Sequence, residues 1–281
     1  MITVFGATGN VGREVVSLLT AAGGPVRAVT RDPSRAGFGA GIEVVRGDPG
    51  RPGDARRALA GADAAFVVTA GPDAPAHALA IAQAVRRCGT GRVVTVSSVA
   101  AMEPVTNAYG AAHAEAERAF RDCGAAWTLL RPAAFMSNTL QWLWSLGSEG
   151  RVYQPYGELP QAVVDPADVA EVAVRALTGP GHEGRVHTLT GPQALTGRDR
   201  ARLLATALGR PVEFVDAPPR AAKEAMVAAG LPAGYAEALL AAQGDPDPAR
   251  GGVPLPTVAE VTGRPPRTFA DWLARHLHRF A

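Results

Sequence analysis

The chain has 281 residues, of which 47% are hydrophobic, so it can bury a sizeable core and is not a disordered protein. Its 28 basic and 26 acidic residues nearly balance, and the basic ones are scattered, which argues against a nucleic-acid-binding protein. The two cysteines show no pairing pattern, no apolar run is long enough to span a membrane, and motif residues begin at Gly6. We therefore expect a cytoplasmic monomer or homodimer that acts on a small molecule.

The first half of the chain alternates short apolar runs with helical patterns, which is typical of a parallel sheet covered by helices. The expected strands are apolar on both faces and cover Ile2–Phe5, Val26–Thr30, Ile42–Arg46, Ala64–Thr69, Arg92–Ser97 and Trp127–Arg131. The expected helices run from Val11 to Ala22 and over Ala55–Ala60, Pro75–Cys88 and Asn107–Cys123. This order predicts an α/β fold with a Rossmann-type doubly wound parallel sheet over residues 1–150.

The remainder, residues 151–281, is expected to form mainly a smaller C-terminal α/β cap that binds substrate, with 166–178 packing back on the Rossmann domain. Beyond Pro132, helices are expected over Phe135–Leu146, Pro166–Leu177, Gly197–Leu208, Arg220–Ala229, Tyr235–Ala242 and Thr268–Phe280. Strands are expected over Arg185–Thr190 and Val212–Val215. The stretch Gln243–Pro256 is rich in Gly, Pro and Asp, which favours a mobile loop.

The first expected strand leads directly into a glycine-rich turn and then into a helix, the place where Rossmann folds hold a dinucleotide pyrophosphate. In this turn Gly6 permits the sharp bend, Gly9 lets the backbone approach phosphate, and Gly12 lets the helix pack on the strand. The helix N-terminus adds unpaired N–H groups and a partial positive charge. The expected cofactor-binding residues of this turn are Gly6, Thr8, Gly9, Asn10, Val11 and Gly12.

The end of the second strand favours NADP(H) over NAD(H). NAD enzymes usually place an acidic residue there for the ribose 2′-hydroxyl, whereas this chain has Arg31, whose guanidinium suits a 2′-phosphate. Asp32 is the counter-evidence, although Asp-Pro-Ser is also a common start of a turn.

Further cofactor contacts are expected at the ends of the next strands. Asp48 follows the third strand, where it can meet the adenine amino group or simply form a turn. The small residues after the fourth strand leave room for a ribose, and two serines follow the fifth strand. The residues expected to contact the cofactor here are Thr69, Ala70, Gly71, Ser97 and Ser98.

Tyr109 and His113 are the catalytic candidates, because positions i and i+4 of a helix share one face. In short-chain dehydrogenases a serine, a tyrosine and a lysine share this arrangement, and the lysine activates the tyrosine. His113 occupies the lysine position here, and an imidazole of ordinary pKa, about 6.5, is mostly neutral at pH 7. Glu117, one turn on, can pair with it and raise its charged fraction. His113 then either acts on the substrate oxygen or only shapes the pocket, and Tyr109 either donates a proton or lies at the rim.

Several motifs appear in order along nearly the whole chain: Gly-Ala-Thr-Gly-Asn-Val-Gly, His113-x-Glu-x-Glu117, Cys123-Gly-Ala-Ala-Trp-Thr-Leu-Leu-Arg131-Pro132, Phe135-Met-Ser-Asn138, Asp165-x-x-Asp168 and Thr190-Gly-Pro. Together they resemble the NmrA-like family of atypical short-chain dehydrogenases, which contains quinone oxidoreductases, isoflavone reductases and redox-sensing regulators. A histidine at position 113 is similar to the quinone oxidoreductase branch, whereas the isoflavone reductases have a lysine there.

The resemblance implies roles for residues after the sixth strand. Arg131, Pro132 and Ala133 would pass beside the nicotinamide. Phe135 and Asn138 would line the substrate pocket, or serve in helix packing and capping. Asp165 and Asp168 are expected to cap the next helix. Trp142, with Leu143 and Trp144, would suit a flat aromatic substrate or belong to the core or a subunit interface.

The sequence thus predicts an NADPH-dependent oxidoreductase that transfers hydride to a small or aromatic carbonyl, quinone or enone without flavin. The alternative is an NADP(H)-binding redox sensor that changes protein partners, since the usual Tyr–Lys pair is altered. Non-redox chemistry on the same fold is a third option. No metal-ligand cluster is expected, and neither nucleic acid nor membrane is an expected partner.

Overall fold

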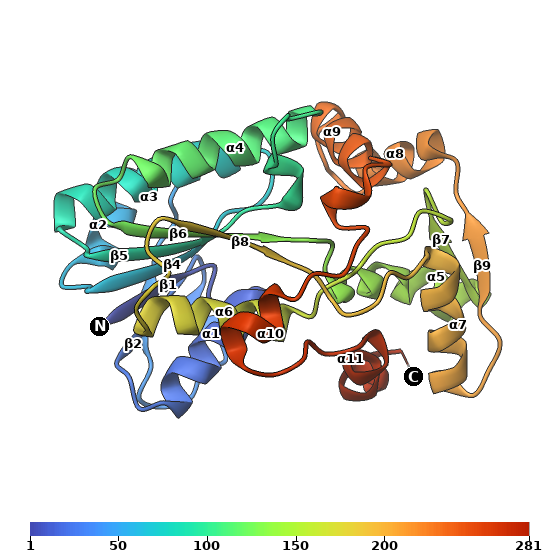
Figure 1. Ribbon diagram of the computed structural model, residues 1–281, viewed down its shortest axis with the longest axis horizontal. Helices are drawn as coiled ribbons and strands as arrows, with labels where there is room; N and C mark the ends of the chain where they lie inside the picture. Colours follow the sequence, from blue (N-terminus) through green and yellow to red (C-terminus); the bar gives the residue numbers. More distant parts are fainter. Residues whose placement is uncertain (281) are drawn as a thin grey trace.

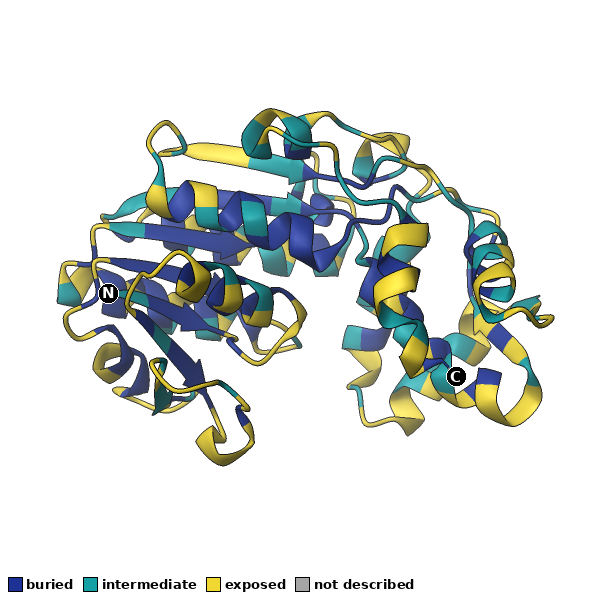
Figure 2. Cartoon of the chain, turned by 90° about the horizontal axis from the view of Figure 1, so that it is seen from below, coloured by how far each residue is buried: buried dark blue, intermediate teal, exposed yellow. Residues whose placement is uncertain are grey.

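A computed structural model describes residues 1–280 and contains a sheet of seven parallel strands in the order β3-β2-β1-β4-β5-β6-β8 (Figure 1). The strands are β1 (Ile2–Phe5), β2 (Val26–Thr30), β3 (Glu43–Arg46), β4 (Ala64–Val68), β5 (Arg92–Val96), β6 (Ala126–Pro132) and β8 (Arg185–Leu189). Their central members are buried on both faces (Figure 2). The strand order reverses between β1 and β4, which is where Rossmann folds bind dinucleotides. The predicted fold class is confirmed.

Helices cover both faces of this sheet (Figure 1). One face carries α1 (Asn10–Ala21) and α6 (Pro166–Thr178), whose apolar sides share a core with β1 and β4. The other face carries α2 (Asp54–Leu59), α3 (Ala74–Cys88) and α4 (Ala108–Arg121). Both cores consist mostly of aliphatic side chains, so burial of apolar area holds the three layers together.

The cap lies beyond the carboxyl ends of the strands (Figure 1). It contains α5 (Leu143–Glu149), β7 (Arg151–Gln154), α7 (Gly197–Leu208), β9 (Glu213–Asp216), α8 (Pro219–Ala228), α9 (Ala233–Gln243) and α11 (Phe269–His276). Strands β7 and β9 form a separate parallel pair. A third core fills the space between these elements and includes Trp142, Phe269 and Trp272, each 1% exposed.

The strand predicted at Arg185–Thr190 is present as β8, whereas three other elements differ from the prediction. Strand β8 joins the main sheet beside β6, and α10 (Thr257–Thr262), which the sequence pattern did not indicate, packs on α6. Both therefore belong with the Rossmann domain although they lie after residue 150. The expected helix Phe135–Leu146 is a 3-10 segment, η3 (Met136–Trp142), followed by α5, and strand β7 was not predicted.

The stretch Gln243–Pro256, predicted as a mobile loop, is fixed to the Rossmann domain. The side chain of Arg250 is 5% exposed and donates to the backbone oxygens of Ala100, Met102 and Pro104. These hydrogen bonds tie the segment to distant backbone atoms, which its own composition does not reveal. Among residues 1–280, no helix combines the length and apolar character needed to cross a membrane.

Candidate active site

The glycine turn between β1 and α1 has the backbone geometry that a pyrophosphate requires. Gly6 adopts φ +71°, a conformation that residues with a Cβ rarely adopt. A Cβ on Gly12 would collide with the carbonyl oxygen of Gly6, so only glycine lets α1 pack this closely on the turn. A Cβ on Gly9 would lie 3.3 Å from the same oxygen and would fill the space above the turn.

The N-terminus of α1 is left open by the sequence around it. Gly9 is the N-cap and offers no capping side chain, and the first turn holds no acidic residue. Thr8, Gly9 and Asn10 are exposed, and the Asn10 amide donates to Ser137 Oγ over 3.0 Å. The first N–H groups of α1 therefore have no side-chain partner, which fits an anionic pyrophosphate. Val11 is buried and can contribute only through its backbone.

The end of β2 presents Arg31 to solvent, while the neighbouring Asp32 is held within its own turn. Asp32 Oδ1 accepts hydrogen bonds from the backbone N–H of Ser34 over 3.1 Å and from its hydroxyl over 2.6 Å. Because this carboxylate caps the short 3-10 turn η1 (Pro33–Arg35), Asp32 serves the turn rather than a free acidic position at the strand end.

Asp48 and the residues after β4 lie at the next strand ends. Asp48 Oδ1 accepts from the backbone N–H of Gly50 over 3.0 Å, so it forms a turn in the free protein. Thr69 is buried, whereas Ala70 is exposed and Gly71 turns the chain with φ +85°. These small residues leave the end of β4 open.

A buried carboxylate links α4 to the ends of β5 and β6. Glu117 is 3% exposed; it accepts from Ser97 Oγ over 2.7 Å and from Arg131 Nε and an Arg131 terminal nitrogen over 2.7 and 2.6 Å. Glu117 was expected to pair with His113, and Arg131 was expected to contact the cofactor. The carboxylate of Glu117 pairs instead with the guanidinium of Arg131, so it acts on His113 only through its charge, and the side chain of Arg131 is engaged by Glu117.

Tyr109 and His113 lie together on α4, with ring centroids 4.7 Å apart and the rings edge to face. Burial lowers the pKa of His113 to about 4, and the carboxylate of Glu117 offsets only part of that shift. Burial, with a smaller contribution from the phenol of Tyr235, raises the pKa of Tyr109 to about 12. At neutral pH both groups are uncharged, so Tyr109 retains its proton and His113 is not an imidazolium.

A cavity of 140 Å³ opens at the carboxyl ends of β5 and β6, beneath the cap. Many of the predicted site residues line it together: Ser97, Ser98, Tyr109, Pro132, Ala133, Phe135 and Asn138. The remaining walls come from residues that the sequence analysis did not single out, among them Gln161, Leu239, Ala242, Gln243 and Arg250. No local motif marks these cap residues; only the fold brings them to the cavity.

Trp142 was expected to contact substrate, and the structure corrects this expectation. It is 1% exposed in the core of the cap, where its ring packs beside the guanidinium of Arg200, and it does not line the cavity. Trp144 is 77% exposed and faces solvent. Asp165 caps α6 as expected, since its carboxylate accepts from the N–H of Ala167 over 2.9 Å. Asp168 is instead paired with Arg267 in the interior.

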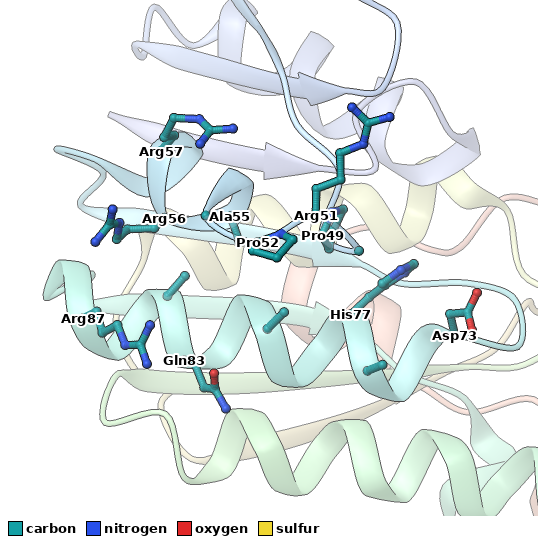
Figure 3. A pocket seen from close by; sticks show the side chains of 15 residues that line it. Pro49, Arg51, Pro52, Ala55, Arg56, Arg57, Asp73, His77, Gln83 and Arg87 are labelled. Carbon is teal, nitrogen blue, oxygen red and sulfur yellow. The ribbon is translucent and has the colours of Figure 1, made fainter.

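A larger cavity, of 950 Å³, lies between α2 and α3 and is rich in arginine (Figure 3). Its side chains do not converge on a common point: Figure 3 shows Arg51, Arg56 and Arg87 directed away from one another. It is lined by none of the predicted catalytic or substrate-binding residues, whereas the smaller cavity is lined by Tyr109, Phe135 and Asn138. We therefore place the candidate active site at the smaller cavity.

Comparison with known proteins agrees with this geometry. Residues 6–180 match the model of a family described as NAD(P)H-binding. The chain belongs to the NAD(P)H-binding family. The resemblance predicted from the motifs is thus confirmed at the level of cofactor and fold.

Several relatives that match nearly the whole chain are named reductases. The chain is 45% identical to a (4-alkanoyl-5-oxo-2,5-dihydrofuran-3-yl)methyl phosphate reductase of Streptomyces griseus, covering 100% of this chain and 99% of the relative. It is 38% identical to an NAD(P)H azoreductase of Xenophilus azovorans, with the same coverage. An Escherichia coli NADPH-dependent quinone oxidoreductase, solved in complex with NADPH, superimposes with a TM-score of 0.83 at 26% identity over 99% of this chain and 100% of that one. The protein is an NAD(P)H-dependent oxidoreductase.

Proposed function

We propose that the protein reduces the conjugated double bond of an enone or quinone with NADPH, without flavin. The observation that carries this proposal is the cavity at the ends of β5 and β6, whose wall holds a protonated phenol, Tyr109, together with Phe135 and Asn138 of the segment after β6. Such a cavity admits a small molecule and offers it hydrogen-bond donors from Tyr109 and Asn138.

The preference for NADPH over NADH rests on the end of β2. Arg31 is free to meet a 2′-phosphate there, and Asp32 is engaged by Ser34. The quinone oxidoreductase of similar fold was solved with NADPH. The residues of the glycine turn hold the pyrophosphate, and the open strand ends at Thr69–Gly71 and Ser97–Ser98 lead from there towards the cavity.

Bound NADPH supplies the hydride. Tyr109 keeps its proton at neutral pH and donates a hydrogen bond to the substrate carbonyl oxygen, where negative charge grows as hydride adds to the conjugated double bond. Solvent then protonates the resulting enolate. The amide of Asn138 can donate a second one. His113 is neutral and packs edge-on against the Tyr109 ring, so it positions the phenol and does not itself supply a proton from an imidazolium.

The names of the relatives support this substrate class. The Streptomyces griseus relative is named for a compound whose ring double bond is conjugated with two carbonyl groups. The names of the azoreductase and the quinone oxidoreductase also refer to molecules with an electron-poor double bond. A polarised, conjugated acceptor is the feature that these compounds share.

The test is an anaerobic assay of NADPH oxidation with a panel of quinones, enones, alkanoyl butenolides and saturated aldehydes. Wild-type protein should oxidise NADPH with the conjugated acceptors. Tyr109→Phe should lower kcat by about a hundredfold, because it removes the donor that meets the developing charge.

The matched control is Tyr153→Phe, which removes an exposed phenol of the cap that bonds to Glu149 and does not line the cavity. Tyr153→Phe should turn over like the wild type. Turnover of saturated aldehydes alone, or equal rates in the two variants, would contradict the proposal.

A further inference from the structure

Helix α9 brings a second tyrosine to the active site from the cap. Tyr235 lies with its ring centroid 6.2 Å from that of Tyr109. Burial raises the pKa of Tyr235, and the nearby backbone N–H of Gly71 partly offsets that shift. One side chain thus touches both α4 and the end of β4.

The same face of α9 continues over the cavity. Leu239 and Ala242 follow Tyr235 at helical spacing, and both line the cavity. Helix α9 therefore runs from the end of β4 to the ends of β5 and β6. Apart from this face it is weakly held, because it buries only Ala236 and Leu240 and its neighbour α8 buries no residue.

The path of the cofactor crosses the place where Tyr235 lies. The glycine turn rests against the end of β4, since a Cβ on Gly6 would meet Val68 at 3.1 Å. The cavity opens two and three strands away from β1, at β5 and β6, with β4 in between. A dinucleotide with its pyrophosphate on the glycine turn and its nicotinamide at the cavity must pass over Thr69–Gly71, under Tyr235.

We infer that Tyr235 is a cofactor-retaining residue, which closes the cap over NADPH at the end of β4 and slows its release. This inference deepens the proposed function, because it concerns the cofactor of the same site. Tyr235 provides a rigid ring for contact, and that ring lies 6.2 Å from the ring of Tyr109, at the place where the cofactor would have to leave.

Stopped-flow release of NADPH from the full-length protein tests this inference. Tyr235→Ala and Tyr235→Leu should each release NADPH about five to ten times faster than the wild type, because the ring contact is lost. Tyr153→Ala, the same change on the exposed side of the cap, should release it at the wild-type rate. Equal release rates in all four proteins would overturn the inference.

A measurement on the wild type keeps the test independent of how the variants fold. Saturating NADPH should slow amide hydrogen exchange in α9 and leave α8 unchanged, whereas unchanged exchange in α9 would contradict the inference. Both readouts use NADPH alone. A protein that binds NADPH and protects α9 but reduces no acceptor would therefore refute the proposed reaction without refuting the role of Tyr235.

Discussion

Glu117 and His113 lie one helical turn apart on α4, but groups from other elements pair with Glu117, and burial keeps His113 uncharged. Arg131 of β6 and Ser97 after β5 satisfy the carboxylate of Glu117. His113 is left with the ring of Tyr109 and a low pKa. The i, i+4 spacing correctly suggests proximity, but it cannot show that a strand far along the chain supplies the stronger partner. The sequence therefore points to the right helix face and to the wrong ion pair.

The low pKa of His113 predicts how stability depends on pH. An unfolded histidine takes up a proton below a pH of about 6.5, whereas folded His113 stays neutral down to a pH of about 4. The free energy of unfolding is therefore unaffected by this residue above about pH 6.5, and it falls as the pH drops from about 6.5 to about 4. At about pH 5 this residue should cost the wild type about 2 kcal/mol of unfolding free energy relative to about pH 7.5.

Urea unfolding of the wild type and His113→Gln at both pH values measures this cost. The variant should lose less stability on acidification, by about the same 2 kcal/mol. His278→Gln, which changes an exposed histidine near the C-terminus, serves as the control and should behave like the wild type. An identical acid sensitivity of His113→Gln and the wild type would show that His113 is not held neutral.

At the scale of elements, the strand–turn–helix unit β1–α1 is the part that the sequence predicts best. Its glycines have separate steric reasons, each of which can be read from spacing alone: Gly6 for the bend, Gly12 for packing and Gly9 for room above the turn. Two of these reasons concern the fold and one concerns the ligand. Substitutions at Gly12 and Gly9 should therefore affect stability and NADPH binding separately.

Gly12→Ala should destabilise the protein by about 2–3 kcal/mol, because the new methyl group would force the helix off the turn. Gly9→Ala should stay within about 1 kcal/mol of the wild type, since its φ of −79° suits alanine, yet bind NADPH about tenfold more weakly or worse. Chemical unfolding and NADPH titration measure the two effects.

Gly147→Ala is the control, because nothing lies within 4 Å of a Cβ there; it should change neither property appreciably. If Gly9→Ala bound NADPH as tightly as the wild type, the turn would not be where the pyrophosphate lies.

Other elements follow from tertiary packing and were therefore missed. Segment η3 has the apolar spacing of a helix, but its chain is drawn into a 3-10 path by the bridge between Phe135 and Val164 at its start. Strand β7 is four residues long and has one fully buried position, Val152, so it offers too little alternation to be recognised without its partner β9.

At the scale of the whole molecule, the Rossmann half was predictable, whereas the side of the cavity that the cap supplies was not. The sheet residues sit at strand ends, whose place follows from the α/β pattern. The cap side of the cavity is formed by α9 and the segment around Arg250, which bonds to backbone oxygens about 150 residues earlier in the chain. Such long-range contacts leave no periodic signal, so Tyr235, Leu239 and Gln243 became visible only in the fold.

The central claim is direct hydride transfer from NADPH to a conjugated acceptor in the cavity beside Tyr109. The most direct measurement supplies the protein, free of flavin, with NADPH deuterated at the transferable position, in parallel with deuterated NADH, and follows the label in the reduced enone. One deuterium at the carbon β to the carbonyl, appearing faster from NADPH than from NADH and strongly slowed in Tyr109→Phe, is the expected result. Product that carries hydrogen only from solvent, or no product from any conjugated acceptor, would contradict it.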